Sequence, residues 1–481
     1  MRSIGIILVF VLHCFTLHSQ ENMGIANSNF SPTNTIFLNP SSSADSKAFI
    51  DFNIIGASTY VLNDYAYFND NLLAIYREVA AGNETEPRYD LGAAPFSAYV
   101  DVQIHGPSLS VSYGKFGGGL FMNLRSVASV SGVPAHLVNH ATNGFDFEDQ
   151  LGNDYTTINA NIGSLSWLEY GVNFSYIISQ SILDMYTFGG NLKYLNGLAG
   201  AGINVQKWDY QVQNDSILNS FEFEGEYGLP NIPTDQAGAS GLLGNGSGVG
   251  LDLGFNYKKM KKSTQGYLPH VAGQCKLKDY QYKFGLSLLD IGSIGIKNGF
   301  YREFSIEDSV VWENYVGTDP EEVVEIDELV NKELLRFSGD SESSSYRMAL
   351  PTALSAQFDY NFGKGFYANS TLVHGFSRKR KLGIKKSSTF SITPRYESRR
   401  LEVALPLTIQ NYQKLRLGAA IRIYSVIFGT DNLGGLMGGG RTYGADFYFS
   451  FKYTMFKPWY CKEKLNRAPK RKKAGVACPI W

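Results

Sequence analysis

The chain contains many short stretches in which large apolar residues alternate with small or polar ones. In Val249–Tyr257 every odd position is apolar or aromatic, and every even position is Gly, Asp or Asn. Similar alternation occurs at 168–176, 186–194, 354–360, 415–423 and 445–453. Because successive side chains of a strand point to opposite faces, each stretch predicts a strand with one apolar face and one wet face.

The residues on the wet face distinguish two kinds of alternating sheet. A soluble sandwich points its apolar face at a core, whereas a membrane barrel points it at lipid and encloses a polar lumen. Here charges and glycines share the middle of the wet face, and tyrosines such as Tyr113, Tyr176, Tyr257 and Tyr360 stand at strand ends, where an interfacial girdle requires them. The pattern favours an all-β chain that forms a transmembrane antiparallel β-barrel over a soluble sandwich.

About fourteen strands can be placed in a barrel domain at residues 48–454. They are expected near 48–60, 97–113, 117–130, 165–180, 184–198, 246–260, 276–290, 346–362, 366–377, 387–397, 399–411, 413–424, 426–430 and 442–454. An even number puts both chain ends on one side, which is the periplasm in a bacterial barrel. Long extracellular loops are then expected at 61–96, 131–164, 199–245 and 291–345, and 261–275 is a longer periplasmic link than such a barrel usually has.

Residues 1–19 have the form of a secretory signal peptide. After a basic start, the apolar run from Ile4 to Leu12 is far shorter than the roughly 20 residues of a membrane helix. The small residue Ser19 suits cleavage after it, whereas no small residue stands directly before Cys14, which argues against a lipoprotein. No later run approaches the length of a membrane helix, so crossing a membrane would require strands.

Charge narrows the function classes. The 481 residues carry a formal net charge of −1, which gives no electrostatic case for nucleic acid binding. Both signs are mixed on the expected inward face, which predicts a lumen of paired charges rather than an ion-selective pore. These inward residues are Asp101, Arg125, Glu169, Lys193, Asp252, Lys283, Asp359, Arg395, Glu402, Arg416, Arg422, Asp446 and Lys452.

The second expected strand changes its alternation at Gly106-Pro107. Val100, Val102 and Ile104 share one parity and Leu109 the other, so a bulge or kink is expected between them. Two interpretations are open. The kink could be an ordinary rim bulge, or a break in the wall through which an apolar ligand leaves sideways.

Residues 20–47, ahead of the first strand, are polar and rich in turn residues, without alternation. Such a segment could fold up into the lumen as a hatch or plug whose backbone is satisfied by inward polar side chains. A disordered tail is the alternative.

Several short motifs resemble a known family. Asn39-Pro40-Ser41, the strand start Leu350–Leu354 and the strand count are similar to the FadL-type long-chain fatty acid transporters of the outer membrane. Runs such as Phe428–Leu433 and Gly444–Phe447 resemble uncharacterised Bacteroidota barrels of that general type. The resemblance implies that Asn39 and Pro40 belong to a lumenal hatch that couples ligand binding to a lateral opening, although Ser41 replaces the family's alanine.

No catalytic motif emerges, and we expect no enzyme activity, cofactor or metal site. Two of the seven histidines lie in the expected signal peptide. Of the others only His136 and His140 are close in sequence, and no carboxylate or cysteine stands at ligand spacing beside them. Asp101 and His105 share the wet face of one strand without a nucleophile motif, so we interpret them as lumenal hydrogen-bonding groups.

A basic tail, 455–481, follows the last strand and bears Cys461 and Cys478. In an oxidising periplasm these two cysteines could close a small loop, with Cys275 left over. The tail is either a flexible charged end or a docking segment for an envelope protein or another periplasmic partner.

Two functions remain open. The first is a FadL-like channel in the outer membrane, in contact with its lipid, for a small or hydrophobic solute. The second is a non-transporting accessory barrel of an outer-membrane secretion or assembly complex.

Overall fold

The computed structural model describes residues 22–83, 85–90, 95–143, 148–214, 217–231, 244–306, 309–313, 341–376, 381–438 and 440–461. The expected signal peptide at 1–19 and most of the expected basic tail lie outside these residues.

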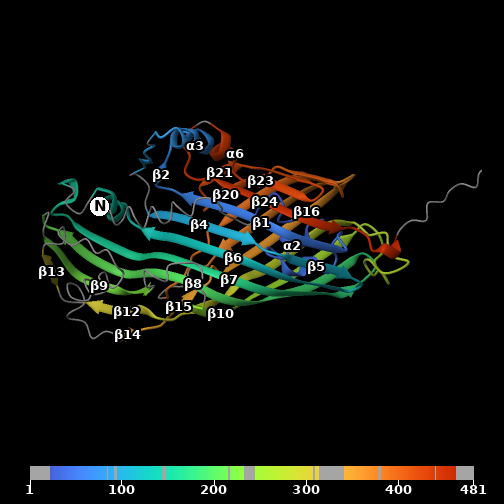
Figure 1. Ribbon diagram of the computed structural model, residues 1–481, viewed down its shortest axis with the longest axis horizontal. Helices are drawn as coiled ribbons and strands as arrows, with labels where there is room; N and C mark the ends of the chain where they lie inside the picture. Colours follow the sequence, from blue (N-terminus) through green and yellow to red (C-terminus); the bar gives the residue numbers. More distant parts are fainter. Residues whose placement is uncertain are drawn as a thin grey trace, which may run out of the picture.

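The chain forms a closed antiparallel β-barrel (Figure 1). In chain order, its fourteen strand positions are occupied by β1 (Ile50–Asn63), β4 (Phe96–His105) with β5 (Ser108–Tyr113), β6 (Phe116–Val133), β7 (Asp154–Gln180), β8 (Asp184–Val212), β10 (Gly246–Met260), β11 (Tyr280–Ile296), β15 (Tyr346–Ala349) with β16 (Ala353–Gly363), β17 (Phe366–Gly375), β18 (Thr389–Glu397), β19 (Leu401–Ala404) with β20 (Leu407–Gln410), β21 (Lys414–Leu417) with β22 (Ala419–Ile423), β23 (Val426–Thr430) and β24 (Asp446–Met455). β1 pairs with β4 and β5 on one side and with β24 on the other, which closes the ring. The expected strand number is confirmed.

The two ends of the barrel differ. We call the end where β1 begins and β24 finishes the proximal end, and the opposite one the distal end.

Among the described residues, no helix is long and apolar enough to cross a membrane.

At the distal end, one side of the wall continues well beyond the ring (Figure 1). The distal parts of β7 and β8 carry β9 (Ile217–Pro230), which pairs with β12 (Gly299–Ile306) and β13 (Val310–Glu313), while β14 (Ser341–Ser343) pairs with β12. The expectation of loops at 131–164, 199–245 and 291–345 is therefore wrong for much of their described length. The reason is a second apolar cluster, in which Val205, Phe223 and Phe304 pack under helix α4 (Ala135–Asn143).

Short elements complete the described chain. They are α2 (Pro32–Thr35), η1 (Pro40–Ser43), β2 (Ala66–Tyr67), α3 (Leu72–Ala80), β3 (Arg88–Tyr89), η2 (Glu148–Gln150), α6 (Leu433–Met437) and η6 (Trp459–Cys461).

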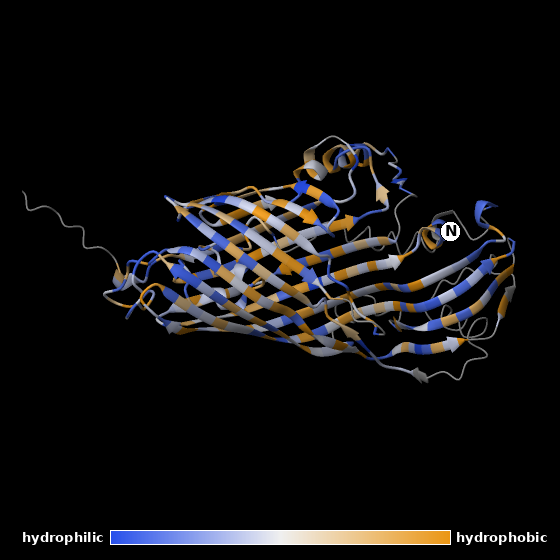
Figure 2. Cartoon of the chain, turned by 180° about the vertical axis from the view of Figure 1, so that it is seen from behind, coloured by the Kyte–Doolittle hydropathy of each residue, from blue (hydrophilic) through white to orange (hydrophobic). Residues whose placement is uncertain are grey.

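The outer face of the wall is apolar, and hydrophobic and hydrophilic residues alternate along the strands (Figure 2). Leu120, Leu192 and Val249 each expose about 60% of their surface, as lipid-facing residues do. Near the proximal end, aromatic side chains form a series of neighbouring pairs across adjacent strands. The pairs are Phe116–Tyr176, Tyr186–Tyr257, Tyr257–Tyr282, Tyr282–Phe358 and Phe366–Tyr396. This arrangement is the girdle expected at a membrane interface.

The inner face is polar and charged. All thirteen charged residues that the sequence placed on the inward face are buried, Lys283 and Arg416 being the most exposed of them at 8%. Strand parity thus assigned the direction of these side chains correctly.

One expectation at the proximal end is wrong. Cys461 forms a disulfide with Cys275, not with Cys478, which lies outside the described residues. Residues 261–279, the proximal strap, cross this end of the barrel: Gly114 donates its N–H to Pro269, and His270 hydrogen-bonds the carbonyl of Ser46. The strap thereby brings Cys275 to a Cα–Cα distance of 5.5 Å from Cys461, although 186 residues separate them in sequence.

Candidate functional site in the lumen

The N-terminal segment, residues 22–49, touches inward-facing side chains on strands from different sides of the barrel. Asn27 donates to Asn369 of β17 at 3.0 Å, and Ser43 donates to Asn173 of β7 at 2.6 Å. The ammonium group of Lys452, on β24, donates to Asn34 at 2.9 Å. Contacts with strands so far apart around the ring place this segment inside the barrel.

Asn39 and Pro40 make the densest of these contacts. The Asn39 amide donates to Gln357 at 2.9 Å and to the carbonyl of Phe255 at 3.1 Å. Its oxygen accepts from the N–H of Ser41 at 3.1 Å and so caps the short helix η1. The Asn173 amide donates to the carbonyl of Pro40 at 3.0 Å, so both residues named by the sequence are anchored to the wall.

Glycines on the facing strands make room for this anchor. A Cβ atom on Gly189 would lie 2.7 Å from the carbonyl oxygen of Pro40, and one on Gly254 would lie 2.7 Å from the Cδ atom of Pro40. One on Gly285 would lie 2.8 Å from the Asn39 amide nitrogen. These distances are shorter than van der Waals contact allows, so a side chain at any of the three positions would displace the segment.

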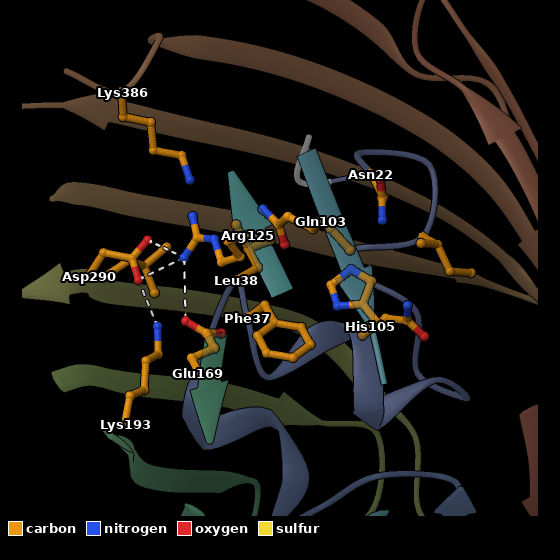
Figure 3. Close-up of a pocket in the computed structure, with 14 residues that line it drawn as sticks. Asn22, Phe37, Leu38, Gln103, His105, Arg125, Glu169, Lys193, Asp290 and Lys386 are labelled. Atoms are coloured by element: carbon orange, nitrogen blue, oxygen red, sulfur yellow. Dashed lines mark hydrogen bonds and ion pairs between the residues drawn. The ribbon is translucent and has the colours of Figure 1, made fainter. Parts of the chain in front are cut away.

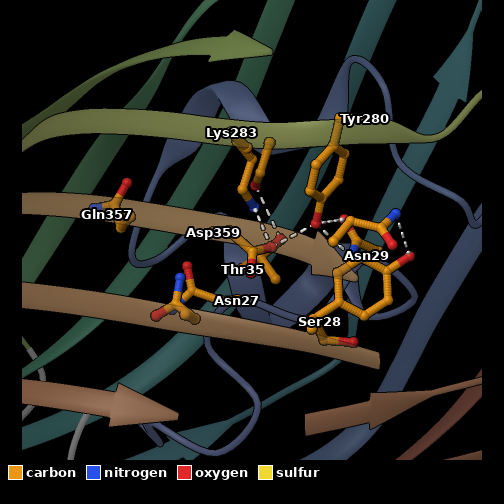
Figure 4. A network of polar contacts seen from close by, with 12 residues as sticks. Asn27, Ser28, Asn29, Thr35, Tyr280, Lys283, Gln357 and Asp359 are labelled. Atoms are coloured by element: carbon orange, nitrogen blue, oxygen red, sulfur yellow. Dashed lines mark hydrogen bonds and ion pairs between the residues drawn. The ribbon is translucent and has the colours of Figure 1, made fainter. Parts of the chain in front are cut away.

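A charge network joins the N-terminal segment to the proximal half of the lumen. The Arg395 guanidinium makes a bidentate ion pair with Asp359, with N–O distances of 3.0 and 2.7 Å, and bonds Glu397 at 2.6 Å. Tyr280 donates to Asp359 and also contacts Asn29 (Figure 4). The Asn29 amide donates to Glu397 at 2.8 Å. These buried charges are therefore compensated partly by wall residues and partly by the segment itself.

A second network lies in the middle of the lumen and is centred on Asp290 (Figure 3). Asp290 accepts from Arg125 at 3.0 and 3.1 Å and from Lys193 at 2.7 Å. Lys193 also pairs with Asp252 at 2.8 Å, and Glu169 lies 3.8 Å from Arg125. The sequence predicted the inward direction of the other four residues but not that of Asp290.

A bulge explains the position of Asp290. In the pairing of β10 with β11, Leu251 faces Ile291 but Leu253 faces Leu288, so β11 carries one extra residue there. Asp290 has a φ of 51°, and its backbone N–H donates to Asp252 at 2.7 Å. In the sequence, the apolar doublet Leu288-Leu289 interrupts the alternation just before Asp290, which is the signal that could have revealed the bulge.

A small cavity of about 40 Å³ lies between the central network and the N-terminal segment. Its lining includes Phe37, Leu38, His105, Arg125 and Lys386 (Figure 3). A space of this size holds on the order of two or three water molecules. A solute larger than that would require the segment or its neighbours to move.

The distal half of the lumen contains an apolar layer. Trp167, Leu195 and Met348 point inward from the wall, are fully buried, and pack with Leu382 and Ile384. The last two residues belong to the inward loop, residues 381–388, which precedes β18. This loop folds into the barrel: Ala349 donates its N–H to the carbonyl of Leu382 at 3.0 Å, and Lys385 donates its N–H to Ser129 at 3.1 Å. The alternation along the chain does not predict this inward turn of the loop.

Gly106 and Pro107 lie in the wall, between β4 and β5. The inward parity changes there, with Asp101 and His105 buried on one side and Ser108 and Ser110 on the other. Pro107 has no N–H for the ladder. Nearby, the Asn53 side chain donates to the carbonyls of His105 at 3.3 Å and Gly106 at 3.1 Å.

The sequence drew attention to two candidate groups, Asp101 with His105 and His136 with His140. Asp101 and His105 have different hydrogen-bond partners. Asp101 accepts from Tyr99 and from Gln103, each at 3.1 Å, whereas the His105 ring pairs with Asn123 at 3.0 Å. His136 and His140 lie on α4, outside the ring. Within the described part of the chain, no group of three or more His, Cys, Asp or Glu residues could hold a metal ion.

Comparison with known proteins assigns a family. Residues 40–431 match the model of a family described as "Family of unknown function (DUF5723)". The chain belongs to this family. No curated protein matches the sequence of this DUF5723 chain.

The DUF5723 chain is also similar to several solved barrels. The Pseudomonas putida toluene transporter TodX is 10% identical, with 92% of this chain and 96% of that one covered at a TM-score of 0.42. The Ralstonia pickettii toluene transporter TbuX is 9% identical, with 92% and 100% covered at 0.41. A Pseudomonas aeruginosa FadL homologue is 12% identical, with 89% and 95% covered at 0.36. These matches include the FadL type that the sequence motifs resemble.

Proposed function

We propose that the protein lies in the outer membrane, with its proximal end in the periplasm, and that it lets a small hydrophobic solute cross. The observation that carries this proposal is the apolar layer in the distal lumen, built by Trp167, Leu195 and Met348 and completed by the inward loop. A barrel that served only as a structural wall would need no apolar layer within a lumen that is otherwise polar.

In this proposal the inward loop and the N-terminal segment act as two closures. The loop covers the apolar layer through Leu382 and Ile384, and the N-terminal segment is the plug that fills the proximal half. Asn39 and Pro40 anchor the plug to the wall. A solute would displace the loop first, then bind the apolar layer, and would leave only when the plug or the wall yields.

The kink at Gly106-Pro107 is the exit that we propose. Pro107 supplies no backbone donor, and the carbonyls of His105 and Gly106 are bonded by the Asn53 side chain, so this point of the wall should be easier to open than an unbroken ladder. Sideways exit there would deliver an apolar solute to the membrane and keep it out of the charged proximal lumen.

Uptake of a hydrophobic fluorescent dye, N-phenyl-1-naphthylamine, tests the proposal in intact cells that produce the protein. The double variant Leu382→Asn/Ile384→Asn places two amides in the apolar layer, each at a cost of about 1–3 kcal/mol, and so favours the displaced loop. We expect dye uptake to rise by about tenfold or more, because each 1.4 kcal/mol shifts an equilibrium tenfold.

The matched control is Lys381→Gln, an exposed residue of the same loop, which should leave uptake at the wild-type rate. Gel migration before and after heating verifies that each variant forms the barrel. Equal uptake by cells with the double variant, with the wild-type protein and with no protein would contradict transport.

A second function is favoured by a different observation. Paired charges fill the central and proximal lumen, and the proximal strap is joined by the Cys275–Cys461 disulfide to the end of the described chain. An accessory barrel of a secretion or assembly complex would need such a closed body and a presented tail. Pull-down from mildly solubilised membranes, with and without residues 462–481, tests this alternative. Loss of a stable envelope protein partner on truncation would support it, and an identical set of partners would count against it.

A further inference from the structure

Helix α3 stands outside the barrel wall at the distal rim. In Figures 1 and 2, α3 and α6 project sideways beyond the outline of the strands, next to β20, β21 and β23. α6 packs against β21, and α3 packs against α6. These helices belong to two different connections, β1 to β4 and β23 to β24, so their association is a tertiary feature of the rim.

The apolar face of α3 is exposed. Leu72, Leu73, Tyr76 and Val79 span an arc of about 120° on a helix of 3.6 residues per turn. Tyr76 exposes 70% of its surface and Val79 56%, and α3 buries none of its residues. Glu78 lies on the opposite side, and Arg77 flanks the arc next to Leu73. If α3 packed its apolar face on the barrel, these apolar side chains would be buried and the polar ones would be exposed.

The pair of helices is held firmly to the rim. Asn71 caps α3 by accepting from the N–H of Ala74 at 3.0 Å, and its amide donates to the carbonyl of Gly438 at 2.8 Å. Phe68 and Thr442 exchange two backbone hydrogen bonds beside them. The exposure of the apolar face is therefore built into the rim and does not arise from a loose helix.

The exposed face continues the lipid-facing surface of the wall. Leu415 and Leu417, on the β21 strand that α6 contacts, are 64% and 51% exposed. Met437 of α6 is 65% exposed, and Tyr412, in the turn before β21, is 59% exposed. Apolar side chains thus extend from the outside of the wall onto the two helices, with tyrosines among them, as in an interfacial belt.

We propose that α3 and α6 form an interfacial anchor that lies in the outer leaflet, with Leu72, Leu73, Tyr76, Val79 and Met437 at the boundary between headgroups and acyl chains. Amphipathic helices bind there by burying their apolar face about 5–10 Å into that boundary. The anchor fixes the depth and the tilt of the barrel on its short side, opposite the tall distal extension. This inference rests on the proposed placement of the barrel in a membrane.

Site-specific fluorescence in lipid vesicles tests the anchor. In a Cys478→Ser background, with the Cys275–Cys461 disulfide intact, single cysteines replace Tyr76 on the apolar face or Glu78 on the polar face, and each is labelled with an environment-sensitive dye. We expect lipids with a quencher near the headgroup to quench the dye at position 76 at least about threefold more than the dye at 78. A quencher near the chain ends should have a smaller effect at position 76.

A cysteine at Leu417 on the wall separates this inference from the proposed function. Quenching at 417 together with weak and equal quenching at 76 and 78 would overturn the anchor and leave the membrane barrel in place. Absence of quenching at all three positions would overturn both. A third outcome is that the dye at position 76 is protected from quenching, and that this protection disappears when the protein is diluted in the vesicles. This result would show that a second copy of the chain covers the apolar face, and it would also overturn the anchor. Gel migration before and after heating identifies variants that form the barrel.

Discussion

The ammonium group of Lys193 lies 2.7 Å from the carboxylate of Asp290, which a bulge in β11 turns into the lumen. The same carboxylate accepts from Arg125, so one residue of β11 with a left-handed backbone conformation links β6 and β8 on the inner face of the wall. Both cations are buried, and their charges would be costly without Asp290. The bulge therefore determines whether the central lumen is electrostatically compensated.

Asp290→Asn should destabilise the barrel by about 3–5 kcal/mol, because it leaves two buried cations with less compensating charge. Urea unfolding in detergent, followed by the heat-dependent migration of the folded barrel on gels, measures the change. Asp70→Asn, at an exposed position, is the matched control and should have almost no effect. A similar unfolding midpoint for the two variants would show that Asp290 contributes little.

Gly189→Ala should displace the N-terminal segment, because the added Cβ would lie 2.7 Å from the carbonyl oxygen of Pro40. In planar bilayers we expect a larger and more variable ion conductance than for the wild type. Gly295→Ala provides the control, since its Cβ would meet only ordinary contact at 3.7 Å. Wild-type conductance in both variants would mean that the segment does not close the lumen.

Asn39→Ala removes the hydrogen bonds to Gln357 and to the carbonyl of Phe255, and also the cap of η1. The partners left behind are buried, so the anchored state should lose roughly 2–4 kcal/mol. Limited proteolysis should then cut residues 22–47 faster than in the wild type. Ser42→Ala, which removes a hydroxyl within the same segment, should have a smaller effect on the cleavage rate.

The disulfide between Cys275 and Cys461 predicts one cross-linked peptide in an unreduced digest analysed by mass spectrometry. Cys275→Ser and Cys461→Ser should each lower the stability of the folded chain by as much as about 5 kcal/mol, since the bond closes a long loop. Cys478→Ser should leave stability unchanged. A peptide joining Cys461 to Cys478 would instead restore the pairing inferred from sequence proximity.

Acid should loosen helix α4 from the distal extension. Burial lowers the pKa of His140 to about 4, with a further contribution from His136, and the ring bonds Tyr210 at 3.1 Å. Because this folded pKa lies below the ordinary value of 6.5, the unfolded helix binds more protons between the two values, and docking weakens as pH falls from 6.5 towards 4. Above pH 6.5 the effect is absent.

Hydrogen exchange at the amides of 137–140, compared at pH 7 and pH 5 after correction for intrinsic rates, measures this loosening. His140→Gln should remove most of the pH dependence, because it removes the imidazole whose pKa is lowered to about 4. An unchanged dependence in that variant would assign the effect to other groups.

The sequence predicts the wall well because its physical signal is local. Alternation within one strand is enough to assign the direction of residues such as Asp252, Arg395 and Lys452, and each of these is buried. The burial of Asn39 and Pro40 against the wall was not derivable from alternation, and only a family resemblance directed attention to these residues. Their partners, Gln357 and Asn173, are far away in sequence and carry no local signature.

The features that the sequence did not predict, or predicted wrongly, have no such local signal. They depend on how distant parts of the chain come together. Asp290 faces inward because of a one-residue bulge, which reverses every direction assigned by parity beyond it. The pairing of Cys275 with Cys461 depends on the path of the proximal strap. Leu382 and Ile384 are buried because their loop turns back into the barrel, where Trp167 and Met348 are already in place.

The contacts of the N-terminal segment also constrain the order in which the molecule is assembled. Asn34, in the N-terminal segment, is bonded by Lys452 on the last strand, and Ser43 is bonded to the fourth strand position. These partners have not yet been synthesised when the segment itself has been. The segment must wait for nearly the whole polypeptide, and the seam between β1 and β24 must close around it. Such non-local pairing is intrinsically slow, so we expect the first described residues to be enclosed only in a late step of folding.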